Sequence, residues 1–239
     1  MDLLDINGRN ALIAYPTTDM PPYGFPVVIA FHGTFGTGYN WFAPDRLITE
    51  MLLHAGYAVI APSSLKCTSE VGHNILCKMP ALRWRLDEQE WNENYDLIFL
   101  SHLLAVAIDE NPSINGNMIH LMGSSNGGFF AILAASLAPQ KFETITICGS
   151  GYTSGFNPDI PTNHPRTLIL HGSLDVIVPS LLSKLYYDAL LKNGITCKRL
   201  INQFAGHGWL GYFNNDIINF ITKDTIDVIN NEHTLEPCI

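Results

Sequence analysis

The chain has 239 residues, of which 47% are hydrophobic and 15% are charged, and its formal net charge at pH 7 is −9. An apolar content this high can fill a sizeable core and excludes an intrinsically disordered protein. The acidic balance, without a basic cluster, argues against nucleic acid as a partner, because phosphate binding requires clustered Lys and Arg. No apolar stretch reaches the length of a membrane span, so none is expected.

The N-terminus and the cysteines bear on the cellular compartment. The chain begins without a basic segment or a long apolar stretch, so we expect no secretory signal and a cytoplasmic location. Five cysteines, an odd number, favour reduced thiols. Cys67 and Cys77 are close enough in sequence to pair in one loop, and a disulfide between them stays open. Their spacing does not favour metal ligation, which uses shorter steps.

The first predicted element is a hairpin over residues 2–15, because apolar and polar residues alternate on both sides of Asn7-Gly8. A loop rich in proline follows it. Residues 27–31 form a continuous apolar run, which is typical of a strand buried on both faces. That strand is followed by a glycine-rich loop over 32–38.

From residue 27 onward, apolar runs alternate with segments of helical periodicity. The expected strands are 27–31, 57–61, 117–122, 144–148, 167–170 and 197–204, and the expected helices are 45–55, 91–109, a helix through 131–137, 180–192 and 209–222. This alternation predicts an α/β fold with a mostly parallel sheet and helices on both faces. We expect a single domain over 1–239, in which the unpatterned segment 62–89 forms a lid or shapes the substrate site.

The sequence Gly123-Ser124-Ser125-Asn126-Gly127 lies between an expected strand and an expected helix. This is the G-x-S-x-G pattern in the strand–turn–helix setting that gives it meaning. The glycines leave room for a tight turn that holds its central residue in a strained backbone conformation. Such a turn would present the Ser125 hydroxyl above the sheet edge, so Ser125 is the predicted nucleophile.

A serine hydroxyl needs an imidazole to take its proton, and the imidazole needs a carboxylate to hold its tautomer. Asp175 and His207 follow Ser125 in the chain, and each comes just after its own expected strand. Ser, Asp, His is the chain order of the α/β-hydrolase fold. Since catalytic groups gather at the carboxyl ends of such strands, we predict that these three residues form the catalytic triad.

Other roles are compatible with some of these residues. Asp175 has the sequence context of a turn or of a cap on the next helix, and Asp159 is a rival acid, although it follows no strand. His32 and His171 each precede a glycine at a strand end, and we expect structural roles for both. The remaining histidines have no metal-ligand spacing, so neither a metal nor a cofactor is predicted.

Attack on a carbonyl produces an oxyanion, which backbone N–H groups can stabilise. Asn126, the residue after the nucleophile, is the expected first donor. The second should come from the loop after strand 27–31, at Thr34 or at Phe35. That loop has no Walker lysine and no G-x-G-x-x-G pattern, which disfavours a phosphate site. Aromatic residues in the strand-end loops are the predicted substrate-binding residues: Phe35, Tyr39, Trp41, Tyr152 and Trp209.

The motifs from residue 27 to residue 210 together resemble a known superfamily. They are Phe31-His32-Gly33, Asp96 to Leu100, Gly123 to Gly128, Leu170 to Pro179 and Gly206 to Trp209. With these motifs the chain resembles the α/β-hydrolase superfamily, and within it the esterase and polyhydroxybutyrate-depolymerase-like group, which is close to feruloyl and acetylxylan esterases. The chain lacks the cysteine often found after His-Gly in that group, which favours a small ester over a polymer.

The resemblance and the triad order together predict a serine hydrolase that cleaves a carboxylic ester through an acyl-enzyme. A thioesterase or a serine peptidase would use the same triad, and a binding protein that has kept only the fold is the alternative of another class. The expected partner is a small-molecule ester. Because His207 must be neutral to act as a base, acylation should fall on the acid side of its titration. The sequence leaves the oligomeric state open.

Overall fold

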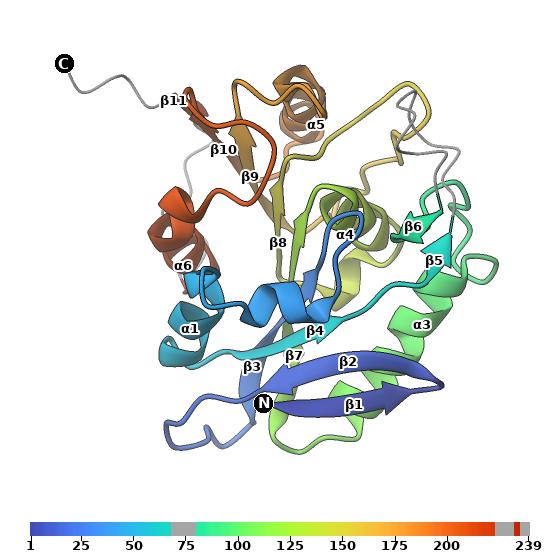
Figure 1. Ribbon diagram of the computed structural model, residues 1–239, viewed down its shortest axis with the longest axis vertical. Coiled ribbons are helices and arrows are strands. Elements are labelled where there is room, and N and C mark those ends of the chain that lie inside the picture. Colours follow the sequence, from blue (N-terminus) through green and yellow to red (C-terminus); the bar gives the residue numbers. More distant parts are fainter. Residues whose placement is uncertain (68–79, 223–231, 235–239) are drawn as a thin grey trace.

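A nine-stranded sheet lies between two layers of helices in the computed structural model, which describes residues 1–67, 80–222 and 232–234 (Figure 1). The strands are β1 (Asp2–Ile6), β2 (Arg9–Ala14), β3 (Phe25–Phe31), β4 (Ala58–Pro62), β7 (Ile114–Ser124), β8 (Thr144–Cys148), β9 (Arg166–Gly172), β10 (Cys197–Asn202) and β11 (Glu232–Thr234). Their order in the sheet is β1-β2-β4-β3-β7-β8-β9-β10-β11. All neighbours from β4 to β11 are parallel.

The hairpin of β1 and β2 is antiparallel, and β2 pairs antiparallel with β4. At its turn, Asn7 and Gly8 both have positive φ, at 54° and 80°, as a two-residue turn of this kind requires. The predicted α/β fold, with a mostly parallel sheet and an N-terminal antiparallel hairpin, is therefore confirmed.

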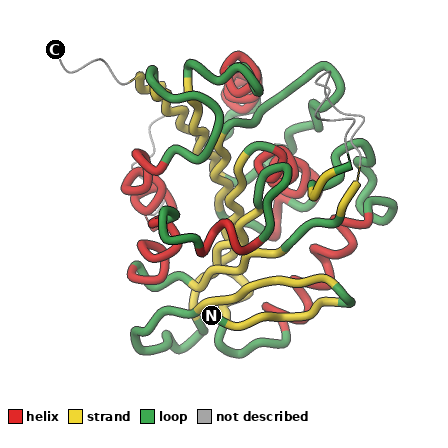
Figure 2. The backbone as a smooth tube through the Cα atoms, in the orientation of Figure 1, coloured by secondary structure: helices red, strands yellow, loops and turns green. Residues whose placement is uncertain are grey.

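Helices cover both faces of the sheet, and the tube in Figure 2 shows the strands between them. The helices are α1 (Leu47–His54), α3 (Tyr95–Leu104), α4 (Asn126–Leu137), α5 (Ser180–Lys192) and α6 (Asn214–Thr222). Apolar residues of α3, α4 and α5 form one core cluster with the sheet, and those of α1 and α6 form another on the opposite face. The central strands β3, β4, β8 and β9 are buried on both faces, which is why they appear in the sequence as continuous apolar runs.

Shorter helical turns lie at the ends of these elements. They are the 3₁₀ turns η1 (Gly38–Phe42), η3 (Pro139–Lys141) and η4 (Gly211–Phe213) and the π-helical turn η2 (Ala105–Asp109). The helix expected from residue 91 begins at Tyr95, because the Asn94 side chain caps it by accepting hydrogen bonds from the N–H groups of Asp96 and Leu97.

The segment 62–89 contains a small two-stranded sheet of β5 (Lys66–Cys67) and β6 (Ala81–Leu82). Residues 68–79 lie outside the described residues, and with them Cys77, so the open question of a disulfide to Cys67 is not tested. The single domain with a lid-like excursion therefore stays a prediction. No helix in the described ranges is long and apolar enough to span a membrane.

Candidate active site

Ser125 lies at the turn between β7 and α4, with φ 54° and ψ −123°. The two glycines of the pattern allow this turn. A Cβ at Gly123 would lie 2.3 Å from Gly127 O, and one at Gly127 would lie 2.2 Å from Phe31 O. The Ser125 N–H donates to Cys148 O at 2.7 Å, so the turn is tied to the neighbouring strand β8. The strained conformation predicted for Ser125 is present.

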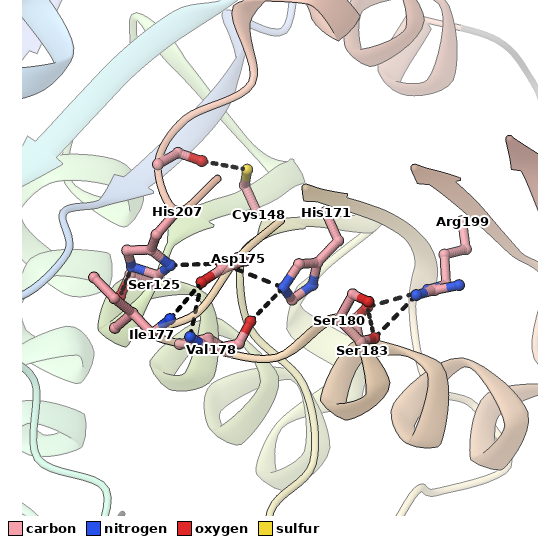
Figure 3. A network of polar contacts seen from close by, with 11 residues as sticks. Ser125, Cys148, His171, Asp175, Ile177, Val178, Ser180, Ser183, Arg199 and His207 are labelled. Carbon is pink, nitrogen blue, oxygen red and sulfur yellow. Dashed lines mark hydrogen bonds and ion pairs between the residues drawn. The ribbon is translucent and has the colours of Figure 1, made fainter. Parts of the chain in front are cut away.

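His207 lies between Ser125 and Asp175 (Figure 3). Its Nε2 is 2.9 Å from Ser125 Oγ, and its Nδ1 is 2.7 Å from Asp175 Oδ2. In the neutral tautomer with the proton on Nδ1, the ring donates to the carboxylate and its free Nε2 accepts the serine hydroxyl. The Asp175 side chain is 1% exposed and that of His207 is 19% exposed. The imidazole therefore has access to solvent, whereas its carboxylate partner is shielded.

The loop after β9 holds the Asp175 carboxylate in place. Oδ1 accepts the N–H groups of Ile177 at 3.0 Å and Val178 at 2.8 Å. His171 Nε2 lies 2.8 Å from Val178 O and 3.4 Å from Asp175 Oδ2. Both contacts are drawn as dashed lines in Figure 3. Burial lowers the pKa of His171, so the ring is neutral and donates its Nε2 proton to Val178 O.

The loop after β8 makes room for the His207 ring. Gly149 has φ 63°, and a Cβ there would come within 3.3 Å of His207 Cε1. The neighbouring Cys148 Sγ lies 3.1 Å from Gly208 O. Burial raises the pKa of the Cys148 thiol to about 12, so the sulfur keeps its proton and donates it to that carbonyl. Gly149 therefore leaves room for the His207 ring, and Cys148 holds the loop that carries it.

The two expected oxyanion donors come from the two chain segments next to Ser125. Asn126 begins α4, directly after the serine. The loop after β3 passes close by, since a Cβ at Gly33 would lie 3.3 Å from Ser125 Cβ. Of the two candidates in that loop, Phe35 already donates its N–H to Leu82 O at 2.9 Å. Thr34 is therefore the better candidate for the second donor.

His32 has a structural role, as the sequence suggested. Its Nδ1 is 2.7 Å from Gly33 O, and its Nε2 accepts the Ser64 N–H at 3.0 Å. Burial lowers the pKa of His32 to about 4, which keeps the ring neutral. With the proton on Nδ1, the ring donates to the Gly33 carbonyl and accepts from Ser64, so both nitrogens are used.

The predicted substrate-binding residues do not all lie in one place. Phe35 and Tyr39 are exposed, at 58% and 56%. Trp41 is 1% exposed and packs edge to face against Trp209, with ring centroids 4.8 Å apart, so it belongs to the core. Tyr152 is half-buried and lines a shallow groove with residues 157–160 and the end of α5, a groove that contains none of the three triad residues.

Two side-chain contacts beside the serine were not anticipated. Trp84 is fully buried, its indole Nε1 donates to His32 O at 3.0 Å, and its backbone pairs with the Asn126 carboxamide. Trp84 lies in a stretch without periodicity, so no sequence signal pointed to it. Within the described ranges, no cluster of three or more His, Cys, Asp or Glu side chains could hold a metal ion.

Comparisons with known proteins point to esterases. Residues 6–169 match the family described as "Putative esterase". A poly(3-hydroxyoctanoate) depolymerase from Pseudomonas fluorescens is 29% identical over 226 residues, which cover 85% of this chain and 76% of the depolymerase.

Solved structures show the same fold at low sequence identity. The Bacillus cereus carboxylesterase is 16% identical with a TM-score of 0.65, over 90% of this chain and 94% of that one. Acyl-protein thioesterase 2 from Zea mays is 14% identical with a TM-score of 0.64, over 89% and 97%. Dipeptidyl peptidase 4 from Porphyromonas gingivalis is 15% identical with a TM-score of 0.65, over 92% of this chain, which spans 34% of that longer peptidase.

Proposed function

Since the chain belongs to this esterase family and is a carboxylic ester hydrolase, we propose that it cleaves its substrate through an acyl-enzyme formed on Ser125, with His207 and Asp175 completing the triad. The observation that carries the proposal is the continuous pair of contacts from Ser125 Oγ to His207 Nε2, at 2.9 Å, and from His207 Nδ1 to Asp175 Oδ2, at 2.7 Å. Both distances suit direct proton transfer and tautomer control.

In acylation, Ser125 Oγ attacks the ester carbonyl carbon while His207 Nε2 takes the hydroxyl proton. The carbonyl oxygen becomes an oxyanion, and Asp175 stabilises the imidazolium that forms. Collapse of this intermediate breaks the bond to the alkoxy oxygen. His207 returns its proton to that oxygen, so an alcohol leaves and the acyl group stays on Ser125.

In deacylation, water takes the place of the alcohol. His207 removes a proton from the water as it attacks the acyl carbon, and the second tetrahedral intermediate expels Ser125 Oγ, which recovers the proton from His207. A carboxylic acid is released and the enzyme is regenerated. None of these steps calls for a cofactor.

The oxyanion in both steps is assigned to the N–H groups of Asn126 and Thr34. They come from the start of α4 and from the loop after β3, which are the two sources used by α/β hydrolases. Removing one such donor typically costs about 100- to 1,000-fold in kcat, so their placement relative to Ser125 matters as much as the triad distances.

For the substrate, we favour an ester with an apolar acyl or aryl group. Exposed apolar side chains neighbour the site residues in sequence on two loops: Phe35 follows Thr34, and Leu174 and Val176 precede and follow Asp175. The similar Pseudomonas fluorescens protein is a depolymerase of poly(3-hydroxyoctanoate), so polyester fragments with long side chains belong in the test beside small esters. A thioester is the second candidate, because the Zea mays thioesterase has the same fold.

The test is hydrolysis of p-nitrophenyl acetate and octanoate by the wild type and by Ser125→Ala. We expect the variant to lose nearly all turnover and all labelling by a fluorophosphonate probe. The matched control is Ser124→Ala, which changes the adjacent serine of the same turn and should keep both. If Ser125→Ala retained wild-type turnover, the proposed nucleophile would be wrong. Thioesters, amides and oligomers of 3-hydroxyoctanoate, run in parallel, would rank the substrate classes.

A further inference from the structure

Residues Leu82 to Trp84, which we call the brace, contact the loop that carries Thr34. Leu82 O accepts the Phe35 N–H at 2.9 Å. The Trp84 indole Nε1 donates to His32 O at 3.0 Å. The brace therefore holds this loop at two points, one on each side of Thr34.

The same brace also holds the start of α4. The Trp84 N–H donates to Asn126 Oδ1 at 2.6 Å, and Asn126 Nδ2 donates to Trp84 O at 3.1 Å. One carboxamide thus satisfies both backbone groups of one residue, much as a neighbouring strand would. Asn126 is buried, so these bonds are shielded from water.

Apolar packing fixes the brace between the same two elements. The Trp84 ring stacks on Phe130 of α4, with centroids 4.9 Å apart and planes 17° apart. It also meets the edge of Phe31, the last residue of β3, at 5.1 Å. Trp84 is fully buried, so its position is set by packing as well as by hydrogen bonds.

The brace is supported from behind by the other limb of the 62–89 segment. The Arg83 N–H donates to Leu65 O at 3.1 Å, and the Ser64 N–H donates to His32 Nε2 at 3.0 Å. The first contact joins residues 64–65 to the brace, and the second joins them to the strand end that precedes Thr34. The base of this segment is therefore joined to the two chain segments that supply the assigned oxyanion donors.

We propose that the Asn126 carboxamide is a positioning residue that acts through Trp84 to fix the spacing between the Asn126 and Thr34 N–H groups. The proposal rests on the proposed function, in which those two groups stabilise the oxyanion. They come from segments far apart in the sequence, which lie side by side because β3 pairs with β7, and the brace adds hydrogen bonds to both segments beyond the ends of those strands. A misplacement of about 1 Å in such a site can cost about 100-fold in rate.

The decisive variant is Asn126→Ala, which keeps the backbone N–H and removes both bonds to Trp84. We expect kcat on p-nitrophenyl esters to fall by about 10- to 100-fold while KM changes by less than about threefold. Affinity for an aryl boronic acid, which forms a tetrahedral adduct with the serine, should fall by the same factor as kcat. This parallel loss is the signature of poorer transition-state stabilisation.

Asn94→Ala is the matched control. Asn94 is also a buried carboxamide that binds backbone carbonyls of the 62–89 segment, those of Arg85 and Glu88 at 3.2 and 2.6 Å, but it anchors them to α3 and not to the serine turn. This variant should lower the thermal unfolding midpoint, since it removes the cap of α3, and leave kcat and boronate affinity within about twofold of the wild type.

A second variant covers the case in which Asn126→Ala does not fold. Trp84→Phe keeps an aromatic ring beside Phe130 but removes the bond to His32 O and part of the buried ring, so it should lower kcat and boronate affinity together, by a smaller factor. Wild-type kcat in a folded Asn126→Ala, or an equal loss in Asn94→Ala, overturns the positioning role. If either of these results came with loss of activity in Ser125→Ala, the positioning role would fail while the proposed function would stand. Failure of the positioning role can therefore be distinguished from failure of the proposed function.

Discussion

Two strand ends on opposite sides of the serine turn carry the same dipeptide. His32-Gly33 follows β3 on the oxyanion side, and His171-Gly172 ends β9 on the acid side. Both imidazoles are buried, burial lowers the pKa of both, and both bind the backbone of the loop that follows. At each strand end a neutral ring holds a functional loop in its conformation.

The two rings differ in what their second contact reaches. His32 uses both nitrogens on backbone groups, Gly33 O and the Ser64 N–H. His171 Nε2 binds Val178 O and also lies 3.4 Å from the Asp175 carboxylate. Its Nδ1 has no hydrogen-bond partner among the described residues. On the oxyanion side, the histidine of this dipeptide therefore supports only a loop. On the acid side, it also faces Asp175, the charged residue of the triad.

The largest effect on turnover should come from removing the negative charge of Asp175 on the acid side. Asp175→Asn keeps the size of the side chain but gives His207 a poorer partner, which favours the wrong tautomer. We expect kcat to fall by about 1,000- to 10,000-fold with the fold retained, measured as ester turnover beside a circular dichroism spectrum. The control is Asp159→Asn, the rival acid, which should keep wild-type turnover. If Asp159→Asn were the inactive variant, the acid would be misassigned.

Acid should destabilise the protein through its buried neutral imidazoles, including the ring on the oxyanion side. Burial lowers the pKa of His32, His120 and His164 from 6.5 to about 4. Between pH 6.5 and pH 4 the unfolded chain binds more protons than the folded protein. The contribution of these rings to the free energy of unfolding is therefore complete above pH 6.5 and is lost as pH falls to 4. Each contributes on the order of 3 kcal/mol. Asp96, whose pKa burial raises, acts in the opposite direction.

Urea unfolding midpoints measured from pH 7.5 to pH 4 test this expectation. The wild-type midpoint should fall steeply below pH 6.5. His32→Gln, which has an uncharged side chain that cannot take up a proton there, should show a shallower slope over the same range. A wild-type midpoint that stayed level from pH 6.5 to 4 would contradict the neutral state of these rings.

Much of the fold could be predicted because its strongest signals are local. The hairpin was visible from Asn7-Gly8, and helix 180–192 was predicted with the bounds that the structure shows for α5. Strands that are buried on both faces appear in the sequence as continuous apolar runs, and these runs predicted the parallel sheet. The order of Ser125, Asp175 and His207 suggested the site because each follows a strand.

What could not be predicted depends on contacts between distant segments or on short elements. β11 has three residues, Glu232–Thr234, with no apolar pattern, and it was missed. Trp41 was predicted to face the substrate, but packing against Trp209 places it in the core. The pairing of Trp84 with Asn126 joins residues far apart in the sequence, and neither residue carries a local signal for it.

The smallest effect should come from the ring on the acid side, and it decides whether the two histidines really differ. His171→Phe keeps an aromatic ring but removes the Nε2–H that donates to Val178 O and lies near the Asp175 carboxylate, so kcat/KM should fall by about threefold to tenfold through a less well-held carboxylate. His171→Gln can still donate a proton from its side-chain amide, so it should recover part of that loss. If both variants lost stability but kept wild-type kcat/KM, His171 would be a loop support of the same kind as His32, and its closeness to Asp175 would have no catalytic consequence.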